Sequence, residues 1–309
     1  MHNNRIIGSF LVIIASLFYG VMPAITQKAI ALGLSVETIL SGRYLLGTVL
    51  IWLYILLKKR DVQVGRNNMA FLLFIGCIMF VCTVLMSESY KHIPGAVAAI
   101  LVFLYVAIVV VLEIIMGREK VQRFRMICLS FALVGMIAVV WTPEGGTKLS
   151  FLGISLALAA GFTYALSAGF TYALSAVAMA AGCLAVVSAE VVMGYAYLVP
   201  MLFNSIRCIA AGQPLFPGEP AQWACILLLG FGSGFIAPVA FCQAIKLIGA
   251  SDAALINTME PLVAYLAGII IMSDHISWNA TLGGVLIAGS ILFLNLSKKK
   301  QIEKEKISS

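Results

Sequence analysis

Long apolar runs constrain this 309-residue chain more than any other feature of its sequence. A helix needs about 20 mostly apolar residues to cross the hydrocarbon core of a bilayer, which is about 30 Å thick. Ten runs of that kind follow one another with short connections, at 6–26, 35–57, 69–89, 94–116, 124–142, 149–177, 182–203, 222–245, 251–272 and 277–297. We therefore predict an all-α integral membrane protein with ten transmembrane helices.

The composition agrees with that prediction. Hydrophobic residues make up 62% of the chain and charged residues 11%, whereas a soluble domain is about 25% charged. This composition excludes a water-soluble enzyme, a nucleic-acid binder and a disordered chain. The first apolar run is too long for a signal peptide, and we expect it to be retained as a helix.

The basic residues indicate how the chain is oriented. If the N-terminus is cytoplasmic, 15 lysines and arginines fall in inside segments and 4 in outside segments, while Arg43 lies within a span. Cytoplasmic loops are enriched in basic residues. We therefore expect a multi-pass protein of the cytoplasmic (inner) membrane with both termini cytoplasmic, ending in a basic tail at 298–309.

Two halves of the chain resemble each other. At an offset of 145, Gly8, Leu11, Ala15 and Tyr19 coincide with the same residue types in the sixth span, where Tyr164 matches Tyr19. We predict two five-helix repeats, 1–145 and 146–297. Because five is odd, the second repeat must be inverted in the membrane, and such inverted repeats are typical of secondary transporters.

One motif gives the chain a family resemblance. Ile256 to Val263 reads INTMEPLV and opens the ninth span, Arg43 stands near the start of the second span, and Gly117-Arg118-Glu119 closes the fourth. With these motifs the chain resembles the EamA-type branch of the drug/metabolite transporter superfamily over nearly its whole length. The resemblance implies a ten-helix exporter of small metabolites, amino acids or drugs, driven by an ion gradient or by the substrate's own gradient.

An octapeptide in the sixth span is duplicated. GFTYALSA occupies 161–168 and is repeated at once at 169–176, which lengthens the span to nearly 30 residues, or about 45 Å at about 1.5 Å per residue. We expect the helix to tilt, to break at Gly161 or Gly169, or to leave the membrane at one end.

An ionisable group within a span costs about 2.5–3.5 kcal/mol and is a functional candidate by default. Glu260 lies in the ninth span, where Pro261 interrupts the helical hydrogen bonds beside it. It is a candidate site for a cation or an amine, and its alternative role is a packing carboxylate bonded to a neighbouring span.

Arg43 and Glu190 occupy equivalent positions in the two repeats if Gly47 is aligned with Gly194. They suit a gate or a clamp for a substrate carboxylate. The alternatives are a structural ion pair, or two side chains that reach the surface separately. We favour a functional role for Arg43 and a structural one for Glu190, and we expect Lys246 to face water.

Other polar groups lie deep in the predicted spans. We include Tyr19, Tyr105, Tyr164, Tyr172 and Asn257 among the candidates for substrate binding, because sites form where inverted repeats meet. The cysteines show no CxxC spacing, and His2, His92 and His275 are terminal or in loops. We therefore expect no metal and no cofactor.

These observations predict a secondary transporter, not an enzyme, that exports a small metabolite or amino acid by alternating access. We expect a small-molecule substrate and contact with membrane lipid, and no nucleic acid. Protons and a second copy of the chain are the further partners we consider. The alternative functions are a non-transporting membrane assembly or sensor subunit, and a lipid-modifying membrane enzyme, which would need a catalytic cluster that the sequence lacks.

Overall fold

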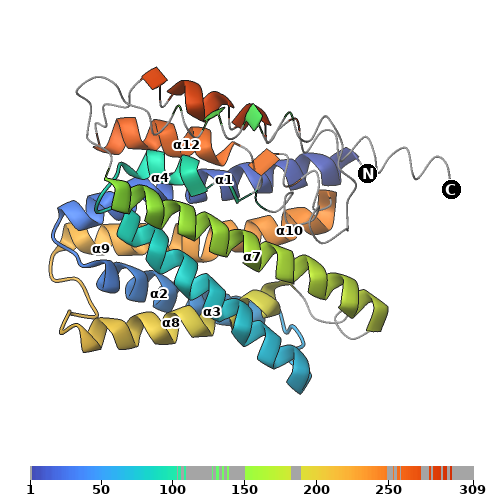
Figure 1. The fold of residues 1–309 in the computed structure, drawn as a ribbon. Coiled ribbons are helices and arrows are strands. Elements are labelled where there is room, and N and C mark those ends of the chain that lie inside the picture. The colour runs from blue at the N-terminus through green and yellow to red at the C-terminus, as the bar shows by residue number, and fades with distance from the viewer. Residues whose placement is uncertain are drawn as a thin grey trace.

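A computed structural model describes residues 2–102, 150–181, 189–248 and 259–272, together with short stretches such as 281–286 and 288–290 and single positions between and after these ranges. Every element of the described part is helical, and the helices lie side by side in a bundle (Figure 1). The elements are α1 (His2–Ala31), α2 (Val36–Leu57), α3 (Arg66–Ser89), α4 (Gly95–Val102), α7 (Phe151–Ala181), α8 (Ala189–Ala210), α9 (Pro220–Leu227), η1 (Leu228–Ile236), α10 (Ala237–Ile248), α12 (Glu260–Ala267) and η2 (Gly268–Met272).

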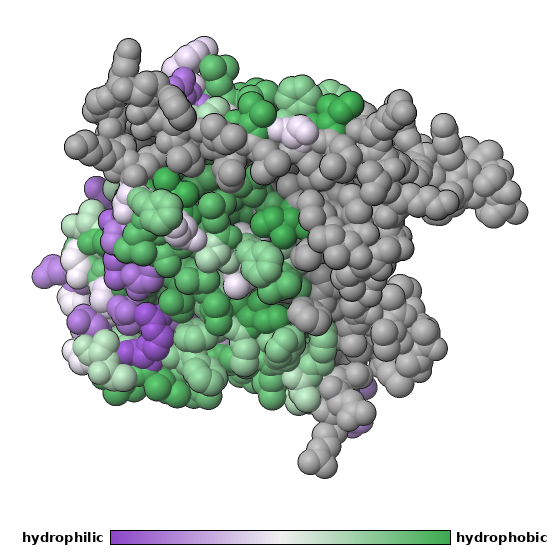
Figure 2. Space-filling view, viewed as in Figure 1, coloured by the Kyte–Doolittle hydropathy of each residue, from purple (hydrophilic) through white to green (hydrophobic). Residues whose placement is uncertain are grey.

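Five helices of the described part are long and apolar enough to cross a membrane, at 4–31, 36–57, 69–89, 190–210 and 220–248. The last of them runs through α9, the π-helical segment η1 and α10. Figure 2 shows hydrophobic side chains over the middle of the visible face and hydrophilic ones gathered at one edge. The all-helical membrane fold is therefore confirmed, while the count of ten helices rests on the sequence, because much of the predicted fourth, fifth and tenth spans lies outside the described residues.

A capped turn joins α1 to α2. α1 ends before Gly33, whose φ of 87° is a left-handed conformation that glycine adopts without a steric penalty. Ser35 then caps α2, and its Oγ accepts a hydrogen bond from the Thr38 backbone N–H at 3.2 Å. The Gln222 amide of α9 donates to the Leu32 carbonyl at 2.9 Å. This turn is thereby fixed to the start of the 220–248 helix, and we call that end of the bundle the turn end.

Helices α2 and α8 pack side by side and antiparallel. At the turn end, the start of α2 meets the end of α8 where Arg207 contacts Glu37 at 2.9 Å. At the opposite end, where α1 begins, a Cβ on Gly194 of α8 would lie 2.9 Å from Ile55 near the end of α2. We call this second end the N-end. The two helices are the second spans of the two predicted repeats, and their antiparallel packing agrees with an inverted repeat.

α7 carries the duplicated octapeptide as one helix. It is continuous from Phe151 to Ala181 through both copies, so a break at Gly161 or Gly169, one of the three alternatives, is wrong. At about 1.5 Å per residue its 31 residues span about 46 Å. Figure 1 shows α7 running obliquely across the bundle and extending past α10, and a tilt in the membrane and an exit from it at one end stay the two predictions.

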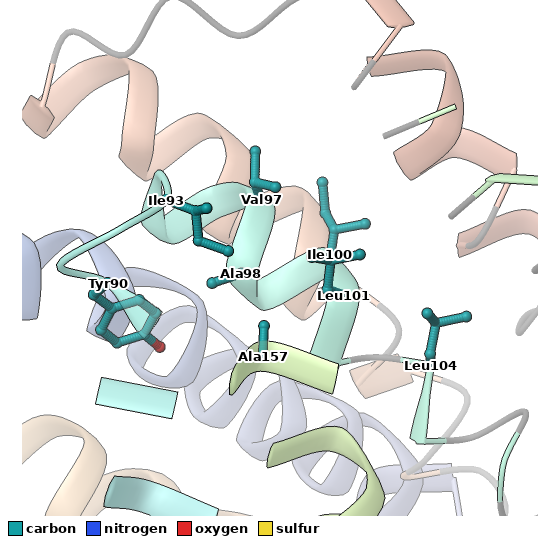
Figure 3. Packing of buried hydrophobic residues seen from close by; sticks show 8 residues of the cluster. All are labelled: Tyr90, Ile93, Val97, Ala98, Ile100, Leu101, Leu104 and Ala157. Carbon is teal, nitrogen blue, oxygen red and sulfur yellow. The ribbon is translucent and has the colours of Figure 1, made fainter. Parts of the chain in front are cut away.

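Small residues let the helices of the core approach closely. The cluster drawn in Figure 3 packs α4 and its flanking residues against Ala157 of α7, which is fully buried. A Cβ on Gly161 would lie only 3.0 Å from the Val102 carbonyl of α4. Close backbone contact of this kind is typical of helix packing in membranes, and it holds α7 against the centre of the bundle.

Candidate functional site

A chain of hydrogen bonds joins Glu260 to α1. The Ser16 hydroxyl of α1 donates to Asn257 Oδ1 at 2.9 Å, and Asn257 Nδ2 donates to Glu260 Oε2 at 3.0 Å. Ser16 is 1% exposed and the carboxylate is half-buried. The amide is therefore oriented by one neighbour and in turn orients the carboxylate.

The position of Glu260 follows from a break in the ninth span. Asn257 is helical, and α12 begins anew at Glu260 with Pro261 in its first turn. Proline has no N–H to donate to the carbonyl four residues earlier, so the Asn257 carbonyl loses its usual partner. The interruption predicted beside Glu260 is confirmed, and it places the carboxylate in the first turn of α12, where a helix favours negative charge.

Gly20 brings α1 and α12 together at this break. A Cβ on Gly20 would lie 2.8 Å from the Glu260 carbonyl oxygen and 2.6 Å from Val263 Cβ. No side chain fits between the two helices at this point. The absence of one at residue 20 is what allows Glu260 to lie against α1.

Three tyrosines lie within electrostatic range of the Glu260 carboxylate, namely Tyr19, Tyr90 and Tyr164. Tyr19 is half-buried and packs beside Ala237 and Ala240 of α10. Tyr164 is 46% exposed, and its ring meets that of Tyr105 edge-on with centroids 4.6 Å apart. These phenols come from three different helices: α1, the end of α3 and α7.

Arg43 is buried on α2, with 8% of its surface exposed. Its Nε has no hydrogen-bond partner, and its guanidinium carbon lies 5.3 Å from the centroid of the Tyr44 ring. Its charge acts on Tyr44, Tyr90 and Tyr197. Tyr90 thus lies within range of both Arg43 and Glu260, and no carboxylate of the described residues forms an ion pair with Arg43.

Arg43 and Glu190 are not partners. Glu190 lies at the N-end, where its Oε1 contacts Lys246 Nζ at 2.5 Å and accepts a hydrogen bond from Gln243. Arg43 lies in the half of α2 nearer the turn end. The structural pair considered for the two residues is therefore wrong, as is the expectation that Lys246 merely faces water.

Tyr172 is the one sequence-predicted candidate still to be placed. Tyr172 belongs to α7, but its side chain lies outside the described residues. Within the part of the chain that the structure describes, His, Cys, Asp and Glu side chains form no group of three that could hold a metal. Sequence reasoning missed Ser16, and its only signal was a small polar residue one helical turn before Gly20.

We expect Ser16→Ala to raise the half-saturating substrate concentration about fivefold, because a neutral hydrogen bond contributes about 1 kcal/mol. Without the Ser16 donor the Asn257 amide is free to turn away from Glu260. Flux into proteoliposomes as a function of substrate concentration measures this. Ser155→Ala is the matched control, because the Ser155 hydroxyl is exposed and bonds only to its own helix. Unchanged half-saturation in Ser16→Ala would refute the positioning role.

Comparisons with known proteins match the two halves of the chain. The model of the EamA-like transporter family matches residues 6–141 and again 151–296. Among curated proteins, none matches the chain. A solved structure titled only "Crystal structure of protein" is similar in fold, with a TM-score of 0.63 and 16% sequence identity over 95% of this chain and 98% of that one.

Proposed function

The chain belongs to the EamA-like transporter family, and from that premise we propose that it is a secondary transporter that exports a small metabolite or amino acid across the cytoplasmic membrane. Members of this family are membrane transporters, which makes a small molecule the substrate. The two family matches, 6–141 and 151–296, lie within the predicted repeats 1–145 and 146–297. The antiparallel packing of α2 and α8 supports an inversion of one repeat relative to the other, and hence alternating access.

The observation that carries this proposal is the hydrogen-bonded carboxylate of Glu260 within an apolar bundle. A charge there destabilises the membrane-inserted protein, so a carboxylate with an oriented amide beside it needs a function to account for it. A carboxylate binds a protonated amine or a proton. Asn257 donates to one of its oxygens at 3.0 Å.

Arg43 complements Glu260 with the opposite charge. A guanidinium binds a carboxylate through paired hydrogen bonds, and Arg43 Nε is buried with no such partner. Tyr90 lies within range of both charged groups. We infer that a substrate carrying an amine and a carboxylate lies with its amine toward Glu260 and its carboxylate toward Arg43, which is the charge pattern of an amino acid.

The basic residues support an orientation with the N-end in the cytoplasm. Arg5 precedes the apolar part of α1, and Lys58, Lys59 and Arg60 follow α2 at the same end. Positive charge of this kind is retained on the cytoplasmic side. Export then moves the substrate from the N-end to the turn end, with a proton gradient as the driving force that we test first.

The experiment is flux of radiolabelled amino acids, and of amines without a carboxylate, into proteoliposomes with and without a pH gradient. Saturable flux above that of protein-free liposomes is expected, and a change on collapsing the gradient assigns proton coupling. Fluxes equal to those of protein-free liposomes across the panel would contradict the proposal.

A variant lacking 169–176 tests whether the second octapeptide copy impairs transport, and it is expected to transport faster because its α7 is about 12 Å shorter.

We expect Arg43→Ala to lower the flux of amino acids about 10- to 150-fold, because a hydrogen bond to a charged group contributes about 1.5–3 kcal/mol. The flux of amines without a carboxylate should fall far less. The comparison of the two substrate classes in one variant measures this. Arg60→Ala in the exposed loop after α2 is the matched control. An equal loss for both classes would assign Arg43 to structure, and full flux of both would show that Arg43 does not bind the substrate carboxylate.

A further inference from the structure

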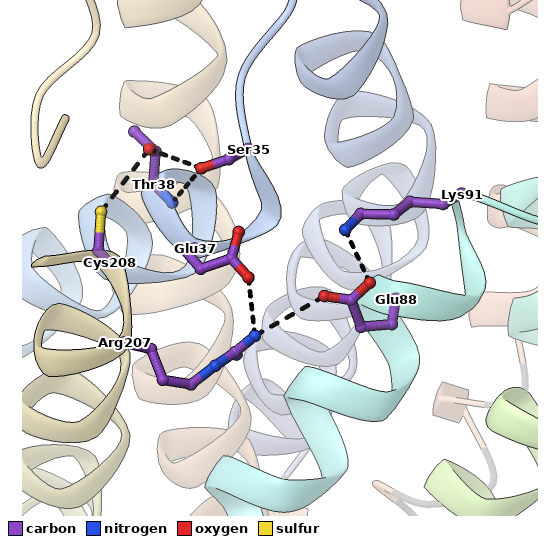
Figure 4. A network of polar contacts seen from close by, with 7 residues as sticks. All are labelled: Ser35, Glu37, Thr38, Glu88, Lys91, Arg207 and Cys208. Carbon is purple, nitrogen blue, oxygen red and sulfur yellow. Dashed lines mark hydrogen bonds and ion pairs between the residues drawn. The ribbon is translucent and has the colours of Figure 1, made fainter. Parts of the chain in front are cut away.

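Two polar networks lie at opposite ends of the bundle, and α8 takes part in both. The turn-end network, drawn in Figure 4, joins Arg207 of α8 to Glu37 of α2 and Glu88 of α3. Arg207 Nη2 lies 2.9 Å from Glu37 Oε1 and 3.7 Å from Glu88 Oε1. Lys91 contacts the same Glu88 at 2.8 Å. One guanidinium thus fixes the end of α8 to two other helices.

The N-end network joins the start of α8 to α10 and α2. Glu190 Oε1 contacts Lys246 Nζ and accepts a hydrogen bond from Gln243 Nε2, and this nitrogen also lies 3.3 Å from the Tyr54 hydroxyl of α2. The Glu190 side chain is 0% exposed, whereas that of Lys246 is 39% exposed. Water therefore reaches the lysine, and the carboxylate depends on the pair to remain buried.

Between the two networks α2 and α8 are joined by uncharged contacts, in which the Ser41 and Ser205 hydroxyls lie 3.0 Å apart and the Thr48 hydroxyl donates to the Tyr197 carbonyl at 3.5 Å. Apolar side chains of both helices pack around these contacts, among them Ile51 and Tyr197. Apolar burial is not directional and a neutral hydrogen bond contributes only about 1 kcal/mol, so these contacts oppose a tilt of α8 less than the charged pairs at its ends do. The ion pairs have defined partners and hold α8 in one position at each end.

Pro200 lies in α8 between the two networks. Proline removes the hydrogen bond to the carbonyl of residue 196 and allows a helix to bend. The half of α8 that carries Glu190 can therefore move without dragging the half that carries Arg207. Charged pairs at both ends, uncharged contacts in the middle and a bend between them suit an element with two positions.

We propose that these networks are the two gates of the transporter, and that Arg207–Glu37–Glu88 and Glu190–Lys246 open in turn as α8 tilts. The proposal rests on the proposed transport function and goes beyond it by naming the residues that control access from each side. Breaking one gate should then favour the conformation open at that end and close the other end more tightly.

The test uses thiol labelling, which requires no substrate. In a background with the native cysteines replaced, Ser41→Cys reports on the turn end and Ile55→Cys on the N-end. Both residues are buried, at 2% and 0% exposed. Labelling by a membrane-impermeant maleimide added to either side of proteoliposomes is measured first with both gates intact, and then with Arg207→Gln or Glu190→Gln.

Opposite changes are the expected result. Arg207→Gln should increase labelling of Cys at 41 about tenfold and decrease that at 55, and Glu190→Gln should do the reverse. The charge-swapped pair Glu190→Lys with Lys246→Glu should restore the original ratio. Lys28→Gln, at the exposed end of α1, is the matched control and should change neither reporter.

Labelling that rises at both reporters in either variant, or at neither, would overturn the gates, because a merely loosened bundle has no reason to close at one end. Opposite changes in a protein without flux would leave the gates standing and contradict the proposed substrate range. Flux in a protein whose two reporters do not change in opposite directions would support the transport proposal and contradict the gates. The two proposals therefore fail separately.

Discussion

Replacing Glu260 with glutamine is expected to lower substrate flux about 100-fold while the protein remains inserted and folds more stably. Glutamine has the same shape, and its amide oxygen still accepts the hydrogen bond that Asn257 donates at 3.0 Å. Only the negative charge is lost, and with it a charge-assisted bond to the substrate amine that contributes about 1.5–3 kcal/mol. Flux in proteoliposomes of equal protein content measures the loss.

Stability decides between the two roles considered for Glu260. A charge within a span costs about 2.5–3.5 kcal/mol, so removing a carboxylate kept for function should raise the melting temperature. If Glu260 instead serves packing, the glutamine variant should melt lower and keep its flux. Asp61→Asn is the matched control, because Asp61 lies in the exposed loop after α2 and bonds only to the nearby Gln63 N–H.

The helix bounds were predictable where the apolar run and the helix end at the same residue. The predicted span 35–57 corresponds to α2 at 36–57, because Lys58 and Lys59 end the apolar run where the helix ends. α1 is longer than its predicted span of 6–26 and reaches Ala31. Hydropathy falls at Gln27 and Lys28, but the helix continues until Gly33 turns the backbone. The length of the apolar run therefore does not show where α1 ends.

The candidate site was predictable in its charges and not in its contacts. Glu260 and Arg43 stand out because ionisable groups are rare within spans. Ser16 does not stand out, and its partner Asn257 is 241 residues away along the chain. Arg43 and Glu190 occupy equivalent positions in the two repeats. Because one repeat is inverted, equivalent positions lie at opposite ends of the bundle, so these two residues are far apart.

Adding a single methyl group to Gly20 is expected to lower flux at least tenfold and, unlike the change at Glu260, to destabilise the protein. In Gly20→Ala the new Cβ would lie 2.6 Å from Val263 Cβ and 2.8 Å from the Glu260 carbonyl oxygen. A backbone oxygen moves only with its helix, so α12 must shift away from α1. Overpacking of this kind costs about 1–3 kcal/mol, which should lower the melting temperature.

The opposite signs of the two stability changes separate charge from geometry. Glu260→Gln leaves the helices in contact and removes the charge, whereas Gly20→Ala keeps the charge and displaces the helix that presents it. If both abolish flux, the carboxylate must be present and must also lie against α1, where Ser16 orients its amide partner. Gly65→Ala is the matched control, because nothing lies within 4 Å of a Cβ at that position. Full flux in Gly20→Ala would show that the contact between α1 and α12 opens during transport at no cost, and that the Ser16 hydrogen bond is dispensable.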